Sequence, residues 1–304
     1  MKSERFDIPI LFLIFNRPDT TEKVFEKIRN IKPKYLYVSA DGARANKPGE
    51  GEKCEQAKDV IKRIDWECEL NINFSETNFG CEEGVTKGIN WFFENVECGI
   101  ILEDDCVPDI SFFNFCEVML EKYKDDKRVM HIGGVNFQDA HKRGNASYYF
   151  SRFCHVWGWA TWKDRWNMYD VKMTDYDENI YNRVSESITS DKEIRNYYKR
   201  FFNTVQANKI DTWDFQWVWT VWKNKGLSII PNVNLVKNIG FGEDATHTVS
   251  TSSNMSELST GSLEEIIFND KVKANEEADR YTYYHKIRRS KFEKIIDKVK
   301  KILK

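Results

Sequence analysis

The chain has 304 residues, with 46 Lys and Arg against 48 Asp and Glu, and a formal net charge of -2 at pH 7. Hydrophobic residues make up 41% and aromatic residues 14%, while Gly and Pro are sparse, which excludes a disordered or fibrous protein and predicts a large core. The balanced charge provides no basic field, so nucleic acid is disfavoured as a partner.

The cysteines and the N-terminal segment bear on localisation. Seven Cys are scattered without C-x-x-C spacing, which argues against both a zinc site and a secreted disulfide framework. The apolar run at residues 8–15 is too short to span a bilayer and is predicted to be a buried strand. We therefore expect a cytoplasmic protein.

The first hundred residues alternate short apolar runs with amphipathic stretches. The runs predict strands at 8–15, 35–38, 70–74 and 99–102, and the stretches between them predict helices at 20–31, up to about 64, and at 82–93. This alternation predicts an α/β fold with a mostly parallel central sheet flanked by helices. Because the carboxyl ends of parallel strands meet at one edge, Arg17, Asp41 and the acidic run 103–105 should converge there, where such sheets bind ligands.

Beyond about residue 130 the alternation weakens. Strands are predicted at 129–132 and 148–153, followed by two Trp-rich segments, HVWGWATWKDRW and DTWDFQWVWTVW, with polar helical sequence between them. No linker rich in Gly, Ser or Pro interrupts this part, so residues 1–270 are expected to form one domain. Most of the Trp side chains are expected in the core.

Residues 271–304 are expected to form a basic amphipathic C-terminal helix. In the tail KIRRSKFEKIIDKVKKILK, apolar residues recur at helical spacing among nine Lys and Arg and two acids. Such a helix either lies on an anionic membrane surface or packs on the domain with a solvated basic face. Both interpretations stay open, and the oligomeric state is not indicated.

The segment ILEDDCVPD places three consecutive carboxylates directly after an apolar run. Asp109 precedes a predicted helix at 110–123 and suits its N-cap. Asp104 and Asp105 stand on the strand side, where their mutual repulsion calls for a cation. Carboxylate oxygens hold Mg²⁺ or Mn²⁺ that bridge to substrate phosphates, so metal binding is favoured over capping for this pair.

A strand that ends in acidic residues holding a divalent ion on a nucleotide diphosphate resembles the D-x-D motif of GT-A glycosyltransferases. The E-D-D version followed by FFNFCEVML is similar to the N-acetylglucosaminyltransferase I family. Four further segments resemble that family in the same order over residues 8–248, namely PILFLIFNRP, VSADG, FCHVWGWATWKDRW and TWDFQW. The resemblance implies a GT-A fold and an inverting, metal-dependent transfer of GlcNAc or a related hexose from a UDP-sugar.

The resemblance also implies roles for single residues on the donor side. Arg17 and Asp41 would contact the nucleotide, with Asp41 accepting a hydrogen bond from the uracil ring. Asp105 would ligate the Mn²⁺ or Mg²⁺ ion. Glu103 and Asp104 would hold the donor sugar and the ribose.

Asp214 would be the general base under the same resemblance. Its neighbours Trp213 and Trp217 are apolar and would raise the pKa of its carboxyl toward the working pH. From the residues alone, an N-cap of a helix at 215–223 is the simpler role for Asp214, and the two roles are compatible.

Three further features carry alternatives. Gly80 and Lys87 lie in NFGCEEGVTKG, where a loop entering a helix can lend N–H groups to an anion, although an ordinary helix start fits as well. His247 in NIGFGEDATHT is either a metal or diphosphate ligand on a loop that closes over the donor or an ordinary surface His. Trp157 or Trp213 at the rim could stack on a sugar face.

These features predict a transferase of surface polysaccharide synthesis, cytoplasmic or peripheral at the inner face of the membrane, with a glycan or lipid-linked acceptor. Members of the family carry an N-terminal membrane anchor, whereas this chain begins close to its first strand, so a bacterial surface glycan is expected rather than an N-glycan. A sugar nucleotidyltransferase is an alternative, but such enzymes usually carry a Gly-rich basic loop where this chain has NRPDTTEK. A non-catalytic carbohydrate-binding protein that uses the Trp rim is the other alternative.

Overall fold

The computed structural model describes residues 6–241 and 258–288. Its strands are β1 (Ile10–Ile14), β2 (Tyr35–Ala40), β3 (Glu69–Phe74), β4 (Cys98–Glu103), β5 (Cys106–Pro108), β6 (Val129–Gly133), β7 (Tyr148–Ser151), β8 (Trp159–Trp162), β9 (Leu227–Pro231) and β10 (Val236–Asn238). Its helices are α1 (Pro18–Ile31), α2 (Glu50–Asp59), η1 (Val60–Arg63), α3 (Gly80–Asn95), α4 (Ile110–Tyr123), α5 (Lys163–Trp166), α6 (Glu178–Ile188), α7 (Lys192–Gln206), α8 (Asp214–Lys223), α9 (Glu276–Thr282) and η2 (Tyr283–Ile287).

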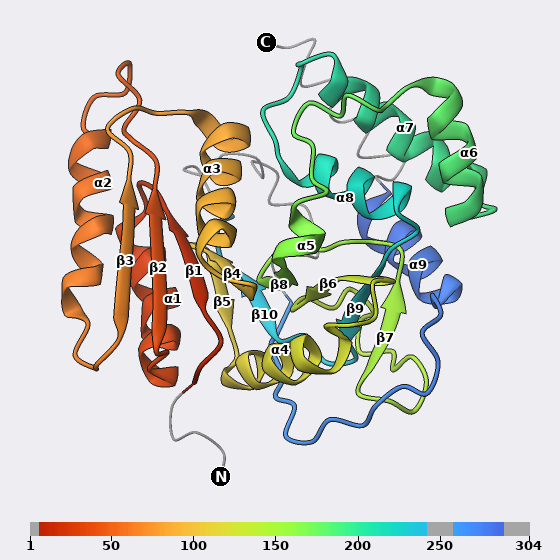
Figure 1. Cartoon of the computed structure of the whole chain (residues 1–304), viewed down its shortest axis with the longest axis horizontal. Helices are drawn as coiled ribbons and strands as arrows, with labels where there is room; N and C mark the ends of the chain where they lie inside the picture. Colours follow the sequence, from red (N-terminus) through yellow and green to blue (C-terminus); the bar gives the residue numbers. More distant parts are fainter. Residues whose placement is uncertain (1–5, 242–257, 289–304) are drawn as a thin grey trace.

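Within the described ranges, eight strands form one sheet in the order β3-β2-β1-β4-β8-β6-β9-β7, which runs across the whole molecule (Figure 1). β1 to β4 are parallel, as are β6 and β9, while β8 and β7 join antiparallel. Four of these seven pairings are parallel, so the predicted α/β class is confirmed, with a sheet that is mixed in its second half. β5 and β10 pair in a separate small ribbon.

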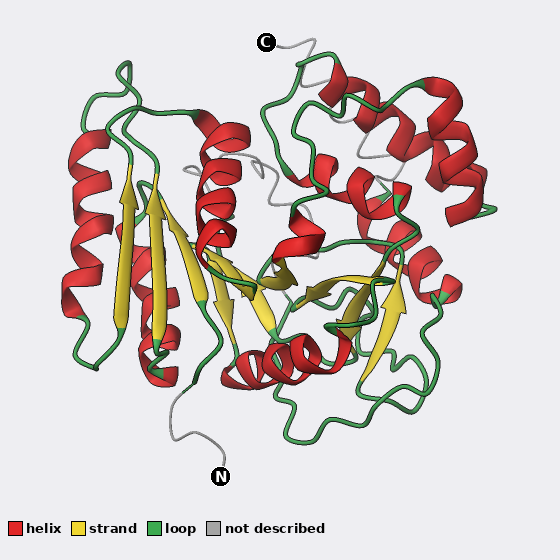
Figure 2. Ribbon diagram, viewed as in Figure 1, coloured by secondary structure: helices red, strands yellow, loops and turns green. Residues whose placement is uncertain are grey.

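Helices cover both faces of the sheet (Figure 2). Phe12 and its neighbours on one face of β1 pack with side chains of α1, η1 and α4. Leu11 and Leu13, on the other face, pack with α3 and α8. All five residues of β1 are buried, which explains why this strand is apolar on both faces rather than alternating.

The Trp-rich segments form the structural core of the second half, as predicted. WATW is β8, and DFQWVWTVWK is α8, whose side chains from Gln216 to Trp222 are all buried. Trp217 packs under the sheet, whereas Trp219 and Trp222 pack against α6 and α7. Because α8 belongs to two apolar clusters, it is apolar on two faces, while its buried polar side chains Gln216 and Thr220 lie one turn apart.

The described part of the predicted tail packs on the domain. In α9, Ala278 is fully buried, and Asp279 accepts a hydrogen bond from the backbone N–H of Arg152 at 3.0 Å. Tyr283, at the start of η2, is 1% exposed. The basic stretch after residue 288 lies outside the described residues. Among the residues that the structure describes, no helix is both long enough and apolar enough to cross a membrane.

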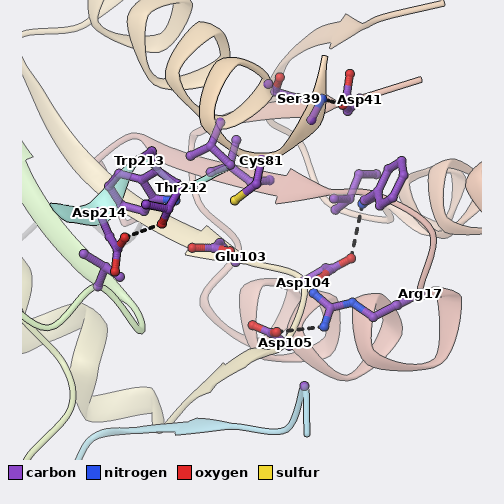
Figure 3. Close-up of a pocket in the computed structure, with 18 of the residues that line it drawn as sticks. Arg17, Ser39, Asp41, Cys81, Glu103, Asp104, Asp105, Thr212, Trp213 and Asp214 are labelled. Carbon is purple, nitrogen blue, oxygen red and sulfur yellow. Dashed lines mark hydrogen bonds and ion pairs between the residues drawn. The ribbon is translucent and has the colours of Figure 1, made fainter. Parts of the chain in front are cut away.

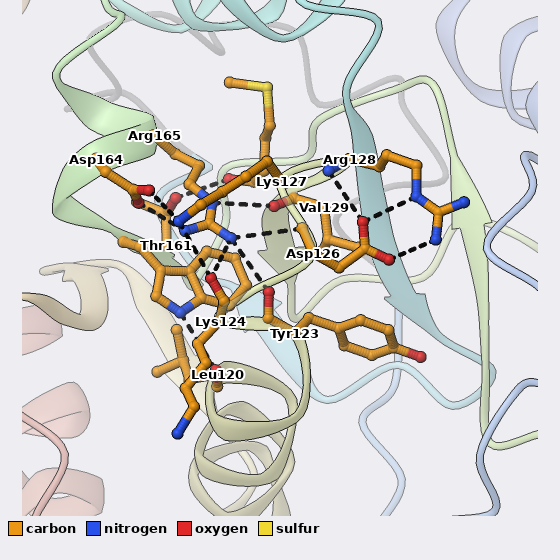
Figure 4. Close-up of polar contacts among 12 residues, drawn as sticks. Leu120, Tyr123, Lys124, Asp126, Lys127, Arg128, Val129, Thr161, Asp164 and Arg165 are labelled. Carbon is orange, nitrogen blue, oxygen red and sulfur yellow. Dashed lines mark hydrogen bonds and ion pairs between the residues drawn. The ribbon is translucent and has the colours of Figure 1, made fainter.

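Arg165 ties the C-terminal end of α4 to β8 and α5 (Figure 4). It is 1% exposed, and its guanidinium lies 4.3 Å from the ring centroid of Trp162. The guanidinium donates to the Asp164 carboxylate at 2.6 Å. It also donates to four backbone carbonyls, those of Tyr123, Lys124, Asp126 and Val129. A helix leaves its last carbonyls without partners, and a cation near them is favourable, so this buried charge has a complete set of partners.

We expect Arg165→Met to lower the free energy of unfolding by about 3–5 kcal/mol, because it strands buried acceptors. Lys127 also pairs with Asp164 but is 61% exposed, so Lys127→Met should cost less than about 1 kcal/mol. Urea unfolding of both variants would measure the difference. Equal losses would show that the buried contacts of Arg165 add nothing beyond the shared ion pair.

Candidate active site

A pocket of about 470 Å³ opens at the carboxyl ends of β1, β2 and β4 (Figure 3). Arg17 follows β1, Asp41 follows β2, and the acidic run 103–105 ends β4, so the predicted convergence at this edge is confirmed. The opposite wall comes from the residues just before and at the start of α8, which include Asp211 and Asp214. A cavity of this size suits a small-molecule ligand.

Most of the residues singled out from the sequence line this one pocket. They are Arg17, Asp41, Gly80, Glu103, Asp104, Asp105, Trp157, Trp213 and Asp214. Lys87 is not among the lining residues: its ammonium pairs with Glu83 at 2.8 Å and lies 3.1 Å from the ring centroid of Phe79. His247 lies outside the described residues.

Arg17 is a cation that pairs with two carboxylates of the acidic run. Pro18 begins α1, and its fixed φ suits the first helical position, which leaves Arg17 in the preceding N-cap position. The guanidinium donates to Asp105 Oδ2 at 2.8 Å and forms an ion pair with Asp104. Burial lowers the pKa of the Arg17 guanidinium, but the two carboxylates outweigh burial and raise it overall. Arg17 is therefore a permanent positive charge held against two carboxylates.

Burial and crowding shift the pKa values of the other carboxyls in this run. Burial raises the pKa of Asp104 to about 6, although Arg17 and the backbone N–H of Phe15 oppose that rise. Burial, together with the charges of Asp105 and Asp104, raises the pKa of Glu103 to about 8. Glu103 is thus the carboxyl in the run that most readily keeps its proton when no further cation is bound.

The fit of a metal at Asp105 depends on which of its oxygens is available. Among the described residues, no group of three or more His, Cys, Asp or Glu is arranged to hold an ion by itself. Asp105 Oδ2 is engaged by Arg17, whereas Oδ1 accepts, among the described residues, from Asn238 and from the Cys106 thiol, each at 3.3 Å. Mg²⁺ is commonly held by one or two carboxylates with substrate phosphates and water, so Asp105 Oδ1 fits an ion shared with a diphosphate. The residues do not fit an all-protein metal cage.

Gly240 allows the backbone to pack closely against the ion pair of Arg17 and Asp105. A Cβ at residue 240 would lie 2.7 Å from Arg17 Nη1 and closer still to Asp105 Oδ2. Asn238, which contacts Asp105, also accepts a hydrogen bond from the Gly240 N–H at 2.8 Å. Only glycine therefore allows the segment after β10 to cover Asp105.

Asp41 uses both oxygens inside the protein. Oδ1 accepts from the N–H of Gly42 at 3.0 Å, and Oδ2 accepts from the Asn78 amide at 2.9 Å. The N–H of Phe79 contacts both oxygens, and that of Gly80 contacts Oδ2 at 3.1 Å. Burial raises the pKa of Asp41, and these N–H groups oppose the rise. A uracil ring N–H, which the resemblance places on Asp41, would have to share an oxygen that already accepts from protein donors.

The sequence leaves two roles open for the start of α3, namely backbone N–H groups that bind a ligand anion or an ordinary helix start. In the structure, the Gly80 N–H is bound to Asp41, and the N–H groups of Cys81 and Glu82 are bound to Asp211. The positive end of this helix thus already holds two carboxylates of the protein itself.

Asp214 is the first residue of α8, whereas the sequence placed it just before that helix. Its Oδ1 accepts from the Thr212 hydroxyl and from the backbone N–H of Phe215 at 2.9 Å. Figure 3 shows its carboxylate facing Glu103 across the pocket. A carboxylate on the far wall from the acidic run is placed to accept a proton from a second substrate.

The two Trp candidates differ in exposure. Trp213 is 3% exposed, and its ring stacks on Trp159 with centroids 5.6 Å apart. Trp157 is half-buried, with the rings of Phe137 and Phe241 nearly perpendicular to its own. Trp157 is therefore the better of the two platforms for a sugar ring.

Several lining residues were not singled out from the sequence. Arg44 lines the pocket while pairing with the buried Glu50, and Asn238 contacts Asp105. Cys81 also lines it, and burial raises the pKa of its thiol. Of these residues, Arg44 could have been predicted from the sequence, because it lies only three residues after Asp41 and therefore near the same end of β2.

The comparisons with known proteins assign no family. No protein-family model matches the chain, and no curated protein matches it. HddC from Yersinia pseudotuberculosis has 10% identity over 57% of this chain and 81% of its own, with a TM-score of 0.34. A UDP-glucose pyrophosphorylase complexed with UDP-glucose has 7% identity over 74% and 90%, with a TM-score of 0.37. Mouse xyloside xylosyltransferase 1 has 9% identity over 71% and 81%, with a TM-score of 0.35. Scores this low place the chain in none of these families.

His131 supports the aromatic layer beneath the pocket. It is fully buried, stacks on Trp159, and accepts at Nδ1 from the Trp217 indole N–H at 3.2 Å. Its Nε2 lies 3.1 Å from the carbonyl oxygen of His155. An indole N–H can only donate, so Nδ1 is unprotonated and Nε2 donates, which fixes the neutral ring. Burial lowers the pKa of His131 to about 3.

We expect this pKa to make the fold sensitive to acid. An unfolded His has a pKa of about 6.5, so between that pH and about 3 only the unfolded state takes up the proton. The contribution of His131 is intact above about pH 6.5 and is lost as the pH falls, by about 1.4 kcal/mol per pH unit. Urea unfolding between pH 7 and pH 4 should show that His131→Asn has a shallower pH slope than the wild type by about that amount. Parallel slopes would contradict the assignment.

Proposed function

We propose that the chain is an inverting, divalent-metal-dependent glycosyltransferase that moves a sugar, GlcNAc or a related hexose, from a UDP-sugar to a glycan or lipid-linked acceptor in surface polysaccharide synthesis. One observation carries the proposal: Asp214 faces the acidic run of β4 across a single pocket at the carboxyl ends of the parallel strands. A cytoplasmic location, peripheral at the inner face of the membrane for a lipid-linked acceptor, belongs to the same proposal.

The charges in the pocket support a metal-bound diphosphate at the donor end. The described lining residues include six carboxylates and two arginines, namely Asp41, Glu103, Asp104, Asp105, Asp211 and Asp214 with Arg17 and Arg44. Both arginines are already paired with carboxylates of the protein. An anionic diphosphate therefore needs an additional cation, and Asp105 Oδ1 offers it a ligand. When bound, a divalent ion supplies the charge that stabilises the departing diphosphate.

Asp214 supports a direct displacement with one base. The acceptor hydroxyl oxygen attacks the anomeric carbon, its proton passes to the Asp214 carboxylate, and the bond from the anomeric carbon to the diphosphate breaks with its electron pair on the diphosphate. This single step inverts the anomeric carbon. Trp157 would stack on a sugar ring beside this centre, while Arg17 holds the acidic run in place.

Sugar nucleotidyl transfer is the second reaction that such a pocket could serve, but its charge favours glycosyl transfer. A nucleotidyltransferase must bind a triphosphate, which carries more negative charge than a diphosphate sugar. With both lining arginines committed to carboxylates, the described pocket suits the less charged substrate. The reaction products separate the two: glycosyl transfer releases a nucleoside diphosphate, and nucleotidyl transfer releases pyrophosphate.

We expect Asp214→Asn to lower kcat for transfer, or for hydrolysis of the donor in the absence of an acceptor, by about 10²–10⁴-fold. Binding of the nucleotide sugar should change little, because Asp214 stands across the pocket from the donor end. The measurement is release of nucleoside diphosphate from a panel of nucleotide sugars with Mn²⁺. Asp177→Asn is the control, since Asp177 also stands at a helix start but lies outside the pocket. A fully active Asp214→Asn variant would rule out the base.

We expect Asp105→Asn to remove the metal-dependent part of nucleotide binding. With UDP at about 100 times its dissociation constant, Mn²⁺ should raise the Tm of the wild type by about 5 °C beyond UDP alone. The variant should lose this increment. Asp109→Ala serves as the control because it removes the N-cap of α4, costing about 1 kcal/mol, while leaving the metal response intact. Retention of the increment in Asp105→Asn would exclude this carboxylate as the ligand.

A further inference from the structure

The first turn of α3 is held by two carboxylates from distant parts of the chain. The N–H groups of residues 79 and 80 donate to Asp41, with distances of 2.9 Å and 3.1 Å to Oδ2. The N–H groups of residues 81 and 82 donate to Asp211, at 3.0 Å and 2.7 Å. A helix has no internal partners for its first N–H groups. Here, two of four successive N–H groups bind Asp41 at the end of β2, and the other two bind Asp211 in the loop that leads into α8.

Two further features secure the contact between Asp211 and α3. The buried side chain of Gln216, in α8, donates to Glu82 Oε2 at 3.0 Å. Gly80 has a φ of +81°, and a Cβ there would lie 2.8 Å from Asp211 Oδ2. The carboxylate thus reaches the helix only because residue 80 is glycine. The starts of α3 and α8 are joined by contacts in both directions.

We propose that Asp211 is a positioning residue that fixes Asp214 relative to the donor half of the pocket. Only two residues separate these carboxylates, so anchoring Asp211 on α3 also anchors the beginning of α8. The same turn of α3 binds Asp41, so both halves of the pocket share one reference point. The inference rests on the proposed function, because it takes Asp214 to be the base.

An ordinary cap would serve its own helix, and Asp211 does not. Asp191 and Asp177 accept from N–H groups two or three residues ahead, in the helices that they precede. Asp211 instead accepts from N–H groups about 130 residues away in sequence, on the opposite wall of the pocket. The hydrogen bonds of Asp211 therefore fix the distance between two walls of the pocket and do not cap the helix that follows it.

The test compares catalysis with donor binding in variants of residue 211. Asp211→Ala should lower kcat by about 10- to 100-fold, because a displacement of about 1 Å at a reacting group costs up to that much. The affinity for UDP with Mn²⁺ should stay within about twofold of the wild type. Asp211→Asn keeps one acceptor oxygen, so its kcat should lie between those of Asp211→Ala and the wild type. The pKa values of the pH–rate profile should not move, since the base itself is unchanged.

Two control variants separate position from charge and from capping. Gly80→Ala keeps every charge but pushes on the Asp211 carboxylate, so it should lower kcat as Asp211→Ala does. Asp191→Ala removes a cap that accepts two N–H groups, at 2.9 Å and 3.3 Å, and lies outside the pocket. It should lose stability and keep kcat. If Asp211→Ala keeps kcat as Asp191→Ala does, the proposal is wrong.

Hydrogen exchange tests the contact between Asp211 and α3 without an activity assay. In Asp211→Ala, amide exchange should rise both at residues 81–82 and at residues 213–217, because the two helix starts are released together. A rise confined to residues 81–82 would make Asp211 a helix cap and overturn the positioning role. If the wild type transfers no sugar from any donor, the proposed function fails, while the exchange data still decide whether Asp211 couples α3 to α8.

Discussion

The pocket brings together six carboxylates but only two arginines among its described lining residues. Ionised carboxylates repel one another and lose hydration when buried, so each needs a partner. Arg17 supplies one for the last two carboxylates of the acidic run, and backbone N–H groups at the start of α3 supply others. The carboxyl of Glu103 is the least well compensated, and burial together with its charged neighbours raises its pKa to about 8. A divalent ion at Asp105 would relieve the charge that remains.

The start of α3 illustrates how this constraint shapes the site. A helix N-terminus carries a partial positive charge and often binds phosphate. In this chain, Asp41 and Asp211 occupy that position, so the same dipole stabilises the protein's own anions. Under the proposed function, a bound diphosphate would then draw its positive charge from elsewhere in the pocket. The capping of α3 is thus a reason for proposing a cation near Asp105.

Local patterns allowed prediction of whatever depends on neighbouring residues. The apolar runs located the parallel strands and their ends, and Asp109 marked the start of α4, where it accepts from the Ser111 N–H at 2.9 Å. The contacts that organise the pocket join residues far apart in sequence, such as Arg17 with Asp104 or Asp211 with Cys81, and no spacing rule identifies them. The Trp-rich segments have similar compositions, so burial of one side chain and exposure of another depend on tertiary packing alone.

The two walls of the pocket are held in physically different ways. The wall that carries the acidic run is organised by charge, through Arg17 after β1 and the carboxylates at the end of β4. The opposite wall is organised by packing, because α8, which begins at Asp214, lies between two aromatic clusters. Ionic contacts respond to salt and to bound cations, whereas close-packed aromatic contacts do not. Under the proposed function, a bound ion would adjust the contacts of Arg17, while aromatic packing and the contact of Asp211 with α3 hold Asp214 in place.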